Sequence, residues 1–439
     1  MQKITFGSNR KMRASAAAAA GLFWAGSLLQ AAARPPADVQ LMKTSSGWEL
    51  RVDGKPFFIQ GVGCNSALGS AGEDYLEMAK ELGANAVRTW GDTSLAYLDR
   101  ADQLGLKVAV GFWLNAVRPE TPQSYQKAAR RRILKERILR GVRRAKNNPA
   151  VLLWGVGTEV FSHTRSPQEK KAFAAFLSDL IESIHREDPH HPIFYGSSDQ
   201  TDLPDVSAFA IPVDLIGIDT YGAPGQGMGW LQRHSFDKPA ILAEFGPHGA
   251  WDVPKDKNGV PFDPSDALKA ADYEATWHQL AAYRGRCLGG FAFVLGEPRN
   301  QDSVTWFNIN DGARRRKAYW TLYHLYTGLK PPRPVPQISE FIVDAATGVR
   351  AGQRFGVRTT AAVADHRPLT YSFAIAKIFS DPLIVEPPRY TAADPQETAP
   401  GAASLRAPEK PGVYRVYARV SDPQGNVAIA DRSIRVLPR

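Results

Sequence analysis

The sequence predicts a (β/α)₈ barrel followed by a small all-β, immunoglobulin-like sandwich. Short β-rich segments alternate with helical segments eight times over about 270 residues, a count and a length typical of this barrel. Beyond a proline-rich stretch the pattern changes to alternating polar and apolar residues between turns, which is typical of antiparallel sheets. The chain has 439 residues, enough for one large and one small domain, and its 44% hydrophobic content is that of a globular protein.

The first 33 residues have the order of parts of a secretory signal peptide. Four basic residues within the first 13 positions precede an alanine-rich apolar run, and Ala31–Ala33 offers a small-residue cleavage site. The run is short and only weakly hydrophobic, so we expect cleavage rather than a membrane anchor. Residues 1–33 are therefore assigned to a signal peptide. The protein is expected to be secreted or periplasmic, with no stable membrane insertion after cleavage.

The charge of the chain does not indicate a nucleic-acid partner. Cleavage would remove four basic and no acidic residues from totals of 54 and 44, and would leave a net charge of +6. Such a modest, scattered excess is common on soluble proteins. The densest basic segment, residues 129–146, is predicted to be an amphipathic helix with a solvated basic face. Its apolar residues at helical spacing are Ile133, Leu134, Ile138, Leu139 and Val142.

Eight segments are predicted to form the barrel strands. Helical segments lie between them, and Gly83 and Gly105 end the first two helices, where a left-handed cap favours glycine. The alternation implies parallel strands and right-handed crossovers. An open doubly wound sheet is the alternative, but GVGCNS after the first strand lacks the full phosphate-binding glycine pattern. The strands are Phe57–Val62, Ala86–Trp90, Lys107–Trp113, Val151–Gly157, Ile193–Gly196, Leu215–Thr220, Ala240–Phe245 and Gly290–Leu295.

The remaining segments complete the domain division. Asp53-Gly54 is a hairpin signal ahead of the first strand, and we expect this hairpin to close the barrel floor. The barrel domain, hairpin included, is assigned to residues 34–329. Residues 330–337, KPPRPVPQ, are predicted to be a stiff extended linker. Residues 338–439 are assigned to the β-sandwich accessory domain, within which Asp381–Pro411 is expected to be a long loop.

The two cysteines are expected to be free thiols. Cys64 follows the first strand and Cys287 precedes the eighth, and these strands are parallel neighbours in a closed barrel. A strand of about six residues at ~3.3 Å each separates the two thiols by close to ~20 Å, too far for a disulfide. Neither cysteine has the spacing of a metal site, and no metal or cofactor is predicted.

Two glutamates follow predicted strands at the end of a barrel where function is usually found. Glu159 comes after the apolar run LLWGVGTEV on the fourth strand, and Glu244 closes the seventh in KPAILAEFG. A carboxylate is costly to bury unless it is paired, so Glu159 by itself would be interpreted as a surface residue past a strand end. Strands four and seven face one another across the mouth, however. The sequence therefore predicts a converging pair, as glycoside hydrolysis requires.

Other residues at strand ends suit a polyol ligand. Arg88, in NAVRTWG, is predicted to point inward and to pair with Glu244, keeping it ionised; a structural ion pair elsewhere is the alternative. Trp90 and Trp113 are candidates for stacking on sugar rings, and Asn65 for binding hydroxyls, although each could equally serve packing or loop structure. His163 lies near Glu159 in sequence, but no second ligand nearby completes a metal set. 

Seven segments resemble the retaining glycoside hydrolases of clan A. They are PFFIQGVGCN, LGANAVRTW, LDRADQLGLKVAV, NNPAVLLWGVGTE, REDPHHPI, DLIGIDTYG and KPAILAEFG, within about residues 45–330. The resemblance is nearest to the catalytic domains of the family 2 β-galactosidase and β-glucuronidase group and to families 5 and 72. It implies a cofactor-free barrel enzyme with Glu159 as acid/base and Glu244 as nucleophile. It further implies that Arg88 is the ionic partner of the nucleophile and Tyr221 a hydroxyl donor beside it.

Two positions depart from these families. They usually have an asparagine directly before the acid/base, where its amide binds a sugar hydroxyl, and this chain has Thr158, with a single hydroxyl donor. Their eighth strand usually ends with a tryptophan that floors the sugar site, and GGFAFVLGE has none at that place. Phe293 or Trp306 is expected to take the place of this tryptophan.

The sequence therefore predicts an exported retaining β-glycosidase, hydrolase or transglycosylase, that acts on O-glycosyl bonds of an oligo- or polysaccharide. The alternative from another class is a non-catalytic carbohydrate-binding or envelope-scaffold protein on a degenerate barrel, suggested by Thr158 and the missing tryptophan. A serine hydrolase is disfavoured because no G-x-S-x-G segment occurs. The carbohydrate substrate is the partner that the sequence indicates.

Overall fold

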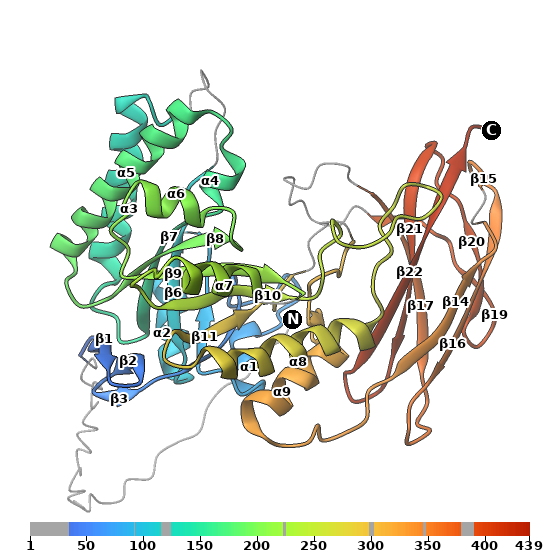
Figure 1. Ribbon diagram of the computed structural model, residues 1–439. Coiled ribbons are helices and arrows are strands. Elements are labelled where there is room, and N and C mark those ends of the chain that lie inside the picture. The colour runs from blue at the N-terminus through green and yellow to red at the C-terminus, as the bar shows by residue number, and fades with distance from the viewer. Residues whose placement is uncertain are drawn as a thin grey trace, which may run out of the picture. The chain divides into compact units, whose positions relative to one another are not determined.

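The computed structural model describes residues 35–91, 93–115, 124–222, 225–297, 303–345, 348–378 and 390–439 (Figure 1). The predicted signal peptide, residues 1–33, lies outside these ranges. Within them, no helix combines the length and the apolar composition needed to cross a membrane.

Eight parallel strands close into a barrel, so the predicted barrel is confirmed. Strand β11 pairs with β4 and thereby closes the ring. The bounds lie near the predicted ones, except that the eighth strand begins at Cys287 rather than Gly290. Gly289 looks like a turn residue in the sequence but belongs to the strand, where a Cβ would lie 2.2 Å from the carbonyl oxygen of Ile59. The strands are β4 (Ile59–Gly63), β5 (Ala86–Arg88), β6 (Lys107–Phe112), β7 (Val151–Thr158), β8 (Ile193–Ser198), β9 (Leu215–Tyr221), β10 (Ala240–Gly246) and β11 (Cys287–Ala292).

Helices follow the strands and pack around the barrel (Figure 1). Gly83 and Gly105 have φ of +88° and +70°, the left-handed conformation expected where α1 and α2 end. The predicted apolar face of α3 is wrong at Ile133, which is 56% exposed, while Leu134 and Ile138 are buried. The helices are α1 (Tyr75–Glu81), α2 (Leu95–Gln103), α3 (Ala128–Ala145), α4 (Val160–His163), α5 (Pro167–Glu187), α6 (Leu203–Ala208), α7 (Gly225–Arg233), α8 (Asp266–Leu280) and α9 (Lys317–Thr327).

A small antiparallel sheet closes one end of the barrel. It consists of β1 (Val39–Thr44), β2 (Gly47–Val52) and β3 (Lys55–Pro56). Asp53 and Gly54 both have positive φ, +51° and +74°, in the predicted hairpin turn. Apolar residues of this sheet share one core cluster with residues from the first halves of the barrel strands. The sheet therefore covers the amino-terminal end of the barrel, opposite the mouth.

The second domain is a sandwich of two sheets that share one core, in line with the predicted fold class, and their strands pair antiparallel except for one short parallel pair. One sheet contains β14 (Gln337–Val343), β16 (Arg354–Ala362), β20 (Ala402–Arg406) and β19 (Gln396–Ala399). The other contains β15 (Val349–Arg350), β22 (Val427–Leu437), β21 (Gly412–Ser421), β17 (Thr370–Lys377) and β18 (Tyr390–Thr391). Side chains from both sheets meet between them, among them Phe341, Leu405, Val416 and Ile434.

The prediction of a long loop over Asp381–Pro411 is wrong in its second half. Strands β19 and β20 form a hairpin there, and β20 also pairs with β16. Pro395 immediately precedes β19, and Pro400 lies in the hairpin turn beside Gly401, whose φ is +76°. The prolines therefore mark the ends of short strands rather than a continuous loop. Residues 381–389 lie outside the described ranges.

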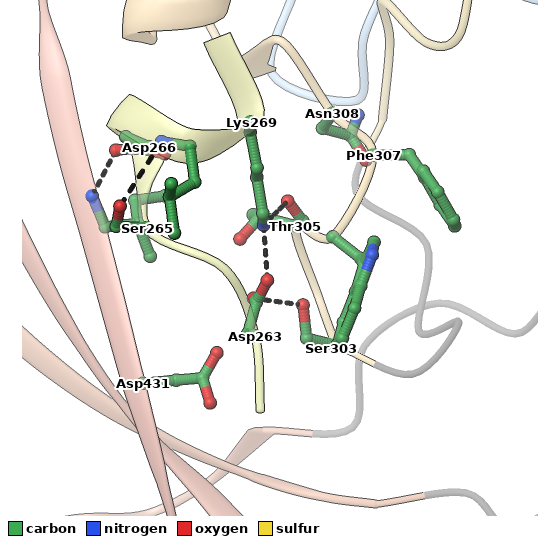
Figure 2. A network of polar contacts seen from close by, with 12 residues as sticks. Asp263, Ser265, Asp266, Lys269, Ser303, Thr305, Phe307, Asn308 and Asp431 are labelled. Carbon is green, nitrogen blue, oxygen red and sulfur yellow. Dashed lines mark hydrogen bonds and ion pairs between the residues drawn. The ribbon is translucent and has the colours of Figure 1, made fainter. Parts of the chain in front are cut away.

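A buried network of charges joins the barrel to the sandwich (Figure 2). Lys269 of α8 lies at its centre, with Nζ 2.5 Å from Asp263 Oδ1 and 3.4 Å from the carbonyl oxygen of Thr305. Buried charges are costly unless they are paired, and each of the three basic residues in the network has an acidic partner. The pairs are Lys269 with Asp263, Arg316 with Asp266, and Arg415 with Asp431.

Thiol titration should find two thiols that react only after unfolding. Cys64 and Cys287 are free and buried, as the sequence predicts. Burial raises the pKa of Cys64 to about 12 and that of Cys287 to about 11, so the reactive thiolate is scarce at neutral pH. A thiol reagent added with and without denaturant measures this. Fast reaction of the native protein, or fewer than two thiols after unfolding, would contradict the strand assignment.

Asp431→Asn should flatten the pH dependence of unfolding. Burial raises the pKa of the Asp431 carboxyl; Arg415 opposes this rise and Asp263 adds to it. A carboxyl whose pKa is raised by folding stabilises the fold below its ordinary pKa, and this contribution is lost as the pH rises through the raised value.

The free energy of unfolding of the wild type, from urea denaturation, should therefore fall relative to that of Asp431→Asn as the pH rises from acid to neutral. Asp179→Asn is the matched control, because Asp179 forms an exposed pair with Lys135. Equal slopes for the wild type and Asp431→Asn would disprove the expectation.

Candidate active site

Three donors hold the Glu244 carboxylate near the carboxyl end of β10. Arg88 Nη1 and Trp90 Nε1 donate to Oε1 at 3.1 and 2.5 Å, and the Tyr221 hydroxyl donates to Oε2 at 2.5 Å. The residue is only 7% exposed. Both carboxylate oxygens are thus fixed in a largely dry environment, which orients the group toward the barrel mouth. The sequence-predicted partners Arg88 and Tyr221 are both part of this arrangement.

Arg88 connects four strands of the barrel interior. From β5, its Nη1 donates to Asp219 Oδ1 of β9 at 3.2 Å and to the carbonyl oxygen of Ala243 in β10 at 2.6 Å. Its Nη2 donates to Thr158 Oγ1 at the end of β7, at 2.9 Å. Arg88 is fully buried, so these bonds replace the water that its charge has lost. Thr158 is therefore drawn into the same group as the nucleophile candidate.

Asp219 is a site residue that the sequence analysis missed. It is buried, pairs with Arg88, and its Oδ2 has no hydrogen-bond partner among the described residues. A signal was present, because Asp219 is the one charged residue in the buried strand LIGIDTY. The same reasoning that singled out Glu159 would have found it.

The carboxyl groups of the site compete for protons. Burial raises the pKa of Glu244; Arg88 opposes this rise and Glu159 adds to it. Burial, and then the charge of Glu244, raises the pKa of Asp219 well above its ordinary range. Pairing with Arg88 is therefore not sufficient by itself to keep Glu244 ionised, because burial favours its neutral form. The pKa of Asp219 is raised further than that of Glu244. When Asp219 carries a proton and is neutral, the positive charge of Arg88 stabilises the Glu244 carboxylate alone.

Glu159 has an unusual backbone conformation at the start of α4. Its φ and ψ are +54° and +28°, in the left-handed region that costs a residue other than glycine about 1–2 kcal/mol. Its side chain makes no hydrogen bond that caps α4, and glutamate is not among the residues that usually cap a helix in this way. Its charge contributes to the raised pKa of Glu244, so Glu159, directly after β7, lies within electrostatic reach of Glu244 in β10.

Tyr195 and Asp202 cap α4 in place of Glu159. The Tyr195 hydroxyl accepts from the backbone N–H groups of Val160 and Phe161 at 2.7 and 3.1 Å, and Asp202 Oδ1 accepts from that of Ser162 at 2.8 Å. Tyr195 in turn donates to Asp202 Oδ2 at 2.6 Å. Because all three N–H groups are satisfied from β8 and the start of α6, no capping hydrogen bond from the Glu159 side chain is needed.

Aromatic rings surround the Glu244 carboxylate. Phe293 lies edge-on to Trp90 and Tyr221, at 5.4 and 5.9 Å between ring centroids. Of the two expected replacements for the missing tryptophan, Trp306 is therefore wrong. It is 1% exposed and its Nε1 donates to the carbonyl oxygen of His248, so its indole is not open to a sugar ring. Trp251, which the sequence analysis missed, is 62% exposed and lies 5.6 Å from Tyr221.

The other predicted residues have different positions. The Asn65 side chain accepts from the backbone N–H of Trp90 at 3.1 Å, and so fixes the chain that carries the indole. Trp113 is 50% exposed just past β6, and its carbonyl oxygen accepts from Arg137. In the described ranges, the ring contacts around Glu244 do not include Trp113. These ranges also hold no group of three or more His, Cys, Asp or Glu residues placed to bind a metal.

Residues 48–251 match the family model described as the TIM barrel domain of the glycosyl hydrolases of family 2. The fold is that of a family 2-type glycoside hydrolase. This family 2-type match begins in β2 and extends beyond β10, and so includes both predicted catalytic glutamates.

One curated protein and two solved structures are similar to parts of this chain. A β-glucuronidase of Rattus norvegicus is 28% identical over 222 residues, which are 44% of this chain and 32% of that protein. The structure of a β-glucuronidase of Bacteroides uniformis has a TM-score of 0.50 at 16% identity, covering 91% of this chain and 48% of the other. A putative β-galactosidase of Bacteroides fragilis has a TM-score of 0.52 at 13% identity, with 91% and 57% covered. The chain thus spans about a third of the curated relative and about half of the solved structures.

Tyr195→Phe should destabilise the protein more than loss of an ordinary tyrosine hydroxyl. It leaves the N–H groups of Val160 and Phe161 buried without an acceptor, at about 1–3 kcal/mol for each group. Tyr97→Phe is the matched control, because its hydroxyl is also buried and donates to the carbonyl oxygen of Cys64. Urea denaturation of both variants measures the difference. Equal losses of unfolding free energy would argue against the capping role.

Proposed function

We propose that the protein is an exported retaining β-glycosidase that acts on an oligo- or polysaccharide. One observation carries the proposal: a buried glutamate near the carboxyl end of β10 is held by Arg88, Trp90 and Tyr221, and a second glutamate, Glu159, directly follows the carboxyl end of β7. Export rests on the signal-like order of residues 1–33. The family 2-type fold supports the reaction class.

The two glutamates divide the reaction into two displacements. Glu159 protonates the glycosidic oxygen as the bond to the leaving group breaks, while Glu244 attacks the anomeric carbon and forms a glycosyl ester. Glu159, now a carboxylate, then removes a proton from water or from an acceptor hydroxyl, which displaces Glu244. Water as the acceptor gives hydrolysis, and a sugar hydroxyl gives transglycosylation.

The surrounding donors keep Glu244 reactive. Arg88 stabilises the carboxylate by charge, and a proton held on Asp219 prevents that residue from competing for the arginine. Burial, then the charge of Glu244, raises the pKa of Tyr221 well above its ordinary value, so its hydroxyl stays a donor. Thr158 Oγ1 accepts from Arg88, and its hydroxyl hydrogen therefore remains for a substrate oxygen.

The relatives guide the choice of sugar. They are named β-glucuronidases and a putative β-galactosidase, so aryl β-glucuronides and β-galactosides are the first substrates to test. The exposed indole of Trp251, beside Tyr221, suits stacking on a further sugar ring of an oligosaccharide.

Covalent labelling tests the proposal. A panel of 2-deoxy-2-fluoro β-glycosides should inactivate the protein and leave a sugar ester that mass spectrometry locates on Glu244. A protein that no member of the panel labels, and that cleaves no β-glycoside, would favour the non-catalytic carbohydrate-binding alternative.

Substitutions of the two glutamates should impair activity in different ways. Glu159→Ala removes protonation of the leaving group, so activity on glycosides with poor leaving groups should fall by roughly 10²- to 10⁴-fold. An activated aryl glycoside needs no such help, so its first step should survive, and azide should rescue turnover with retained configuration. Glu244→Ala removes the nucleophile, so both substrate types should fail, and any azide product should be inverted.

Glu274→Ala, on α8, is the control for loss of a carboxylate far from the mouth. Rates on alkyl and dinitrophenyl β-glycosides, with product configuration by NMR, distinguish the cases. Full turnover by both Glu159→Ala and Glu244→Ala would refute the assignment of the pair.

A further inference from the structure

His163 contacts the candidate acid/base directly. Its Nε2 lies 3.1 Å from Glu159 Oε2, and the two side chains are 46% and 26% exposed. His163 is the last residue of α4 and follows Glu159 by four positions, so one helical turn brings its ring back over the carboxyl group. The contact joins a group that must carry a proton in one step of the proposed reaction to a side chain that both donates and accepts protons.

The backbone around this contact is fixed from several sides. The His163 N–H donates to the carbonyl oxygen of Glu159 at 3.3 Å, and the Ser162 hydroxyl donates to the same oxygen at 2.9 Å. The cap formed by Tyr195 and Asp202 holds the first turn of α4. The backbone that carries the two side chains is therefore held by buried elements.

We propose that His163 is a positioning residue that keeps the transferable proton of Glu159 on the oxygen facing the substrate. The proposal rests on the proposed function. When the imidazole donates its Nε2–H to Oε2, that oxygen acts as an acceptor, and the acid proton resides on Oε1. A proton on Oε2 would instead point at the imidazole and away from the glycosidic oxygen. The same Nε2–H bond persists when Glu159 becomes a carboxylate, so one tautomer of His163 serves both steps.

Two titrating groups, His163 and Asp202, lie beside this helix. The hydrogen bond to Glu159 raises the pKa of His163, burial opposes the rise, and the nearby Asp202 adds to it. Burial raises the pKa of Asp202 to about 6. The donor role rests on the contact between Nε2 and Oε2, which a neutral N–H donor can also make.

Two substitutions separate donation from charge. His163→Ala removes the donor, and His163→Gln keeps an N–H donor without a titratable charge. With an alkyl β-glycoside, kcat/KM of His163→Ala should fall by about 2- to 10-fold, the value of one hydrogen bond between neutral groups. With a dinitrophenyl β-glycoside it should stay near that of the wild type. His163→Gln should recover most of the alkyl activity.

A matched control exists on α5. His185 Nε2 lies 2.8 Å from Asp214 Oδ2 in a pair of similar exposure on the outside of the barrel, so His185→Ala should leave both activities unchanged. In NMR titrations of the whole protein, Glu159→Gln should lower the pKa of His163 and leave that of His185 as it is.

Each outcome decides the proposal. Wild-type alkyl activity in His163→Ala, or equal losses on both substrates, overturns the positioning role while the proposed function stands. An unchanged His163 pKa in Glu159→Gln also overturns it. A wild type that neither cleaves nor labels at Glu244 overturns the proposed function and the role of His163 with it.

Discussion

The buried guanidinium of Arg88 is the interaction on which the barrel mouth depends. An unpaired charge inside a protein costs several kcal/mol, and Arg88 avoids this cost by binding groups from β7, β9 and β10 at once. A Cβ at the nearby Gly196 would lie 3.1 Å from both Asp219 Oδ2 and Thr158 Oγ1, so a larger residue there would crowd these two groups. Charge pairing and available space together fix the positions of Asp219, Thr158 and Glu244.

The position of the second glutamate, Glu159, depends on a different set of contacts. Glu159 is placed by a short helix whose free N–H groups are satisfied from elsewhere, by Tyr195 and Asp202. The usual capping side chains are Ser, Thr, Asp and Asn, and glutamate is not among them. Transferring the cap to β8 leaves the carboxyl group free for His163 and for the mouth. One glutamate is thus held rigidly by donors, whereas the other remains partly exposed.

The sandwich domain contacts a segment that also borders the site. The backbone N–H of Val304 donates to the Tyr417 hydroxyl of β21 at 3.0 Å, and Phe307, three residues on, lies 5.0 Å from Tyr221. Tyr273 of α8 donates to the carbonyl oxygen of Phe307 at 3.1 Å. The charge network around Lys269 holds the same segment through Thr305 (Figure 2). The second domain therefore contributes to the support of the aromatic wall beside Glu244.

The sequence by itself determined the barrel, the sandwich, the hairpin at Asp53-Gly54 and the two glutamates at strand ends. These features have local signals, namely alternation of segments, turn residues and single charges in apolar runs. The tertiary structure decided Asp219 beside Arg88, the cap from Tyr195, the burial of Trp306 and the exposure of Trp251. Arg88 and Asp219 are separated by 131 positions, and Val160 and Tyr195 by 35. Such contacts depend on strand register and on which face a side chain presents, and both are fixed only when the barrel closes.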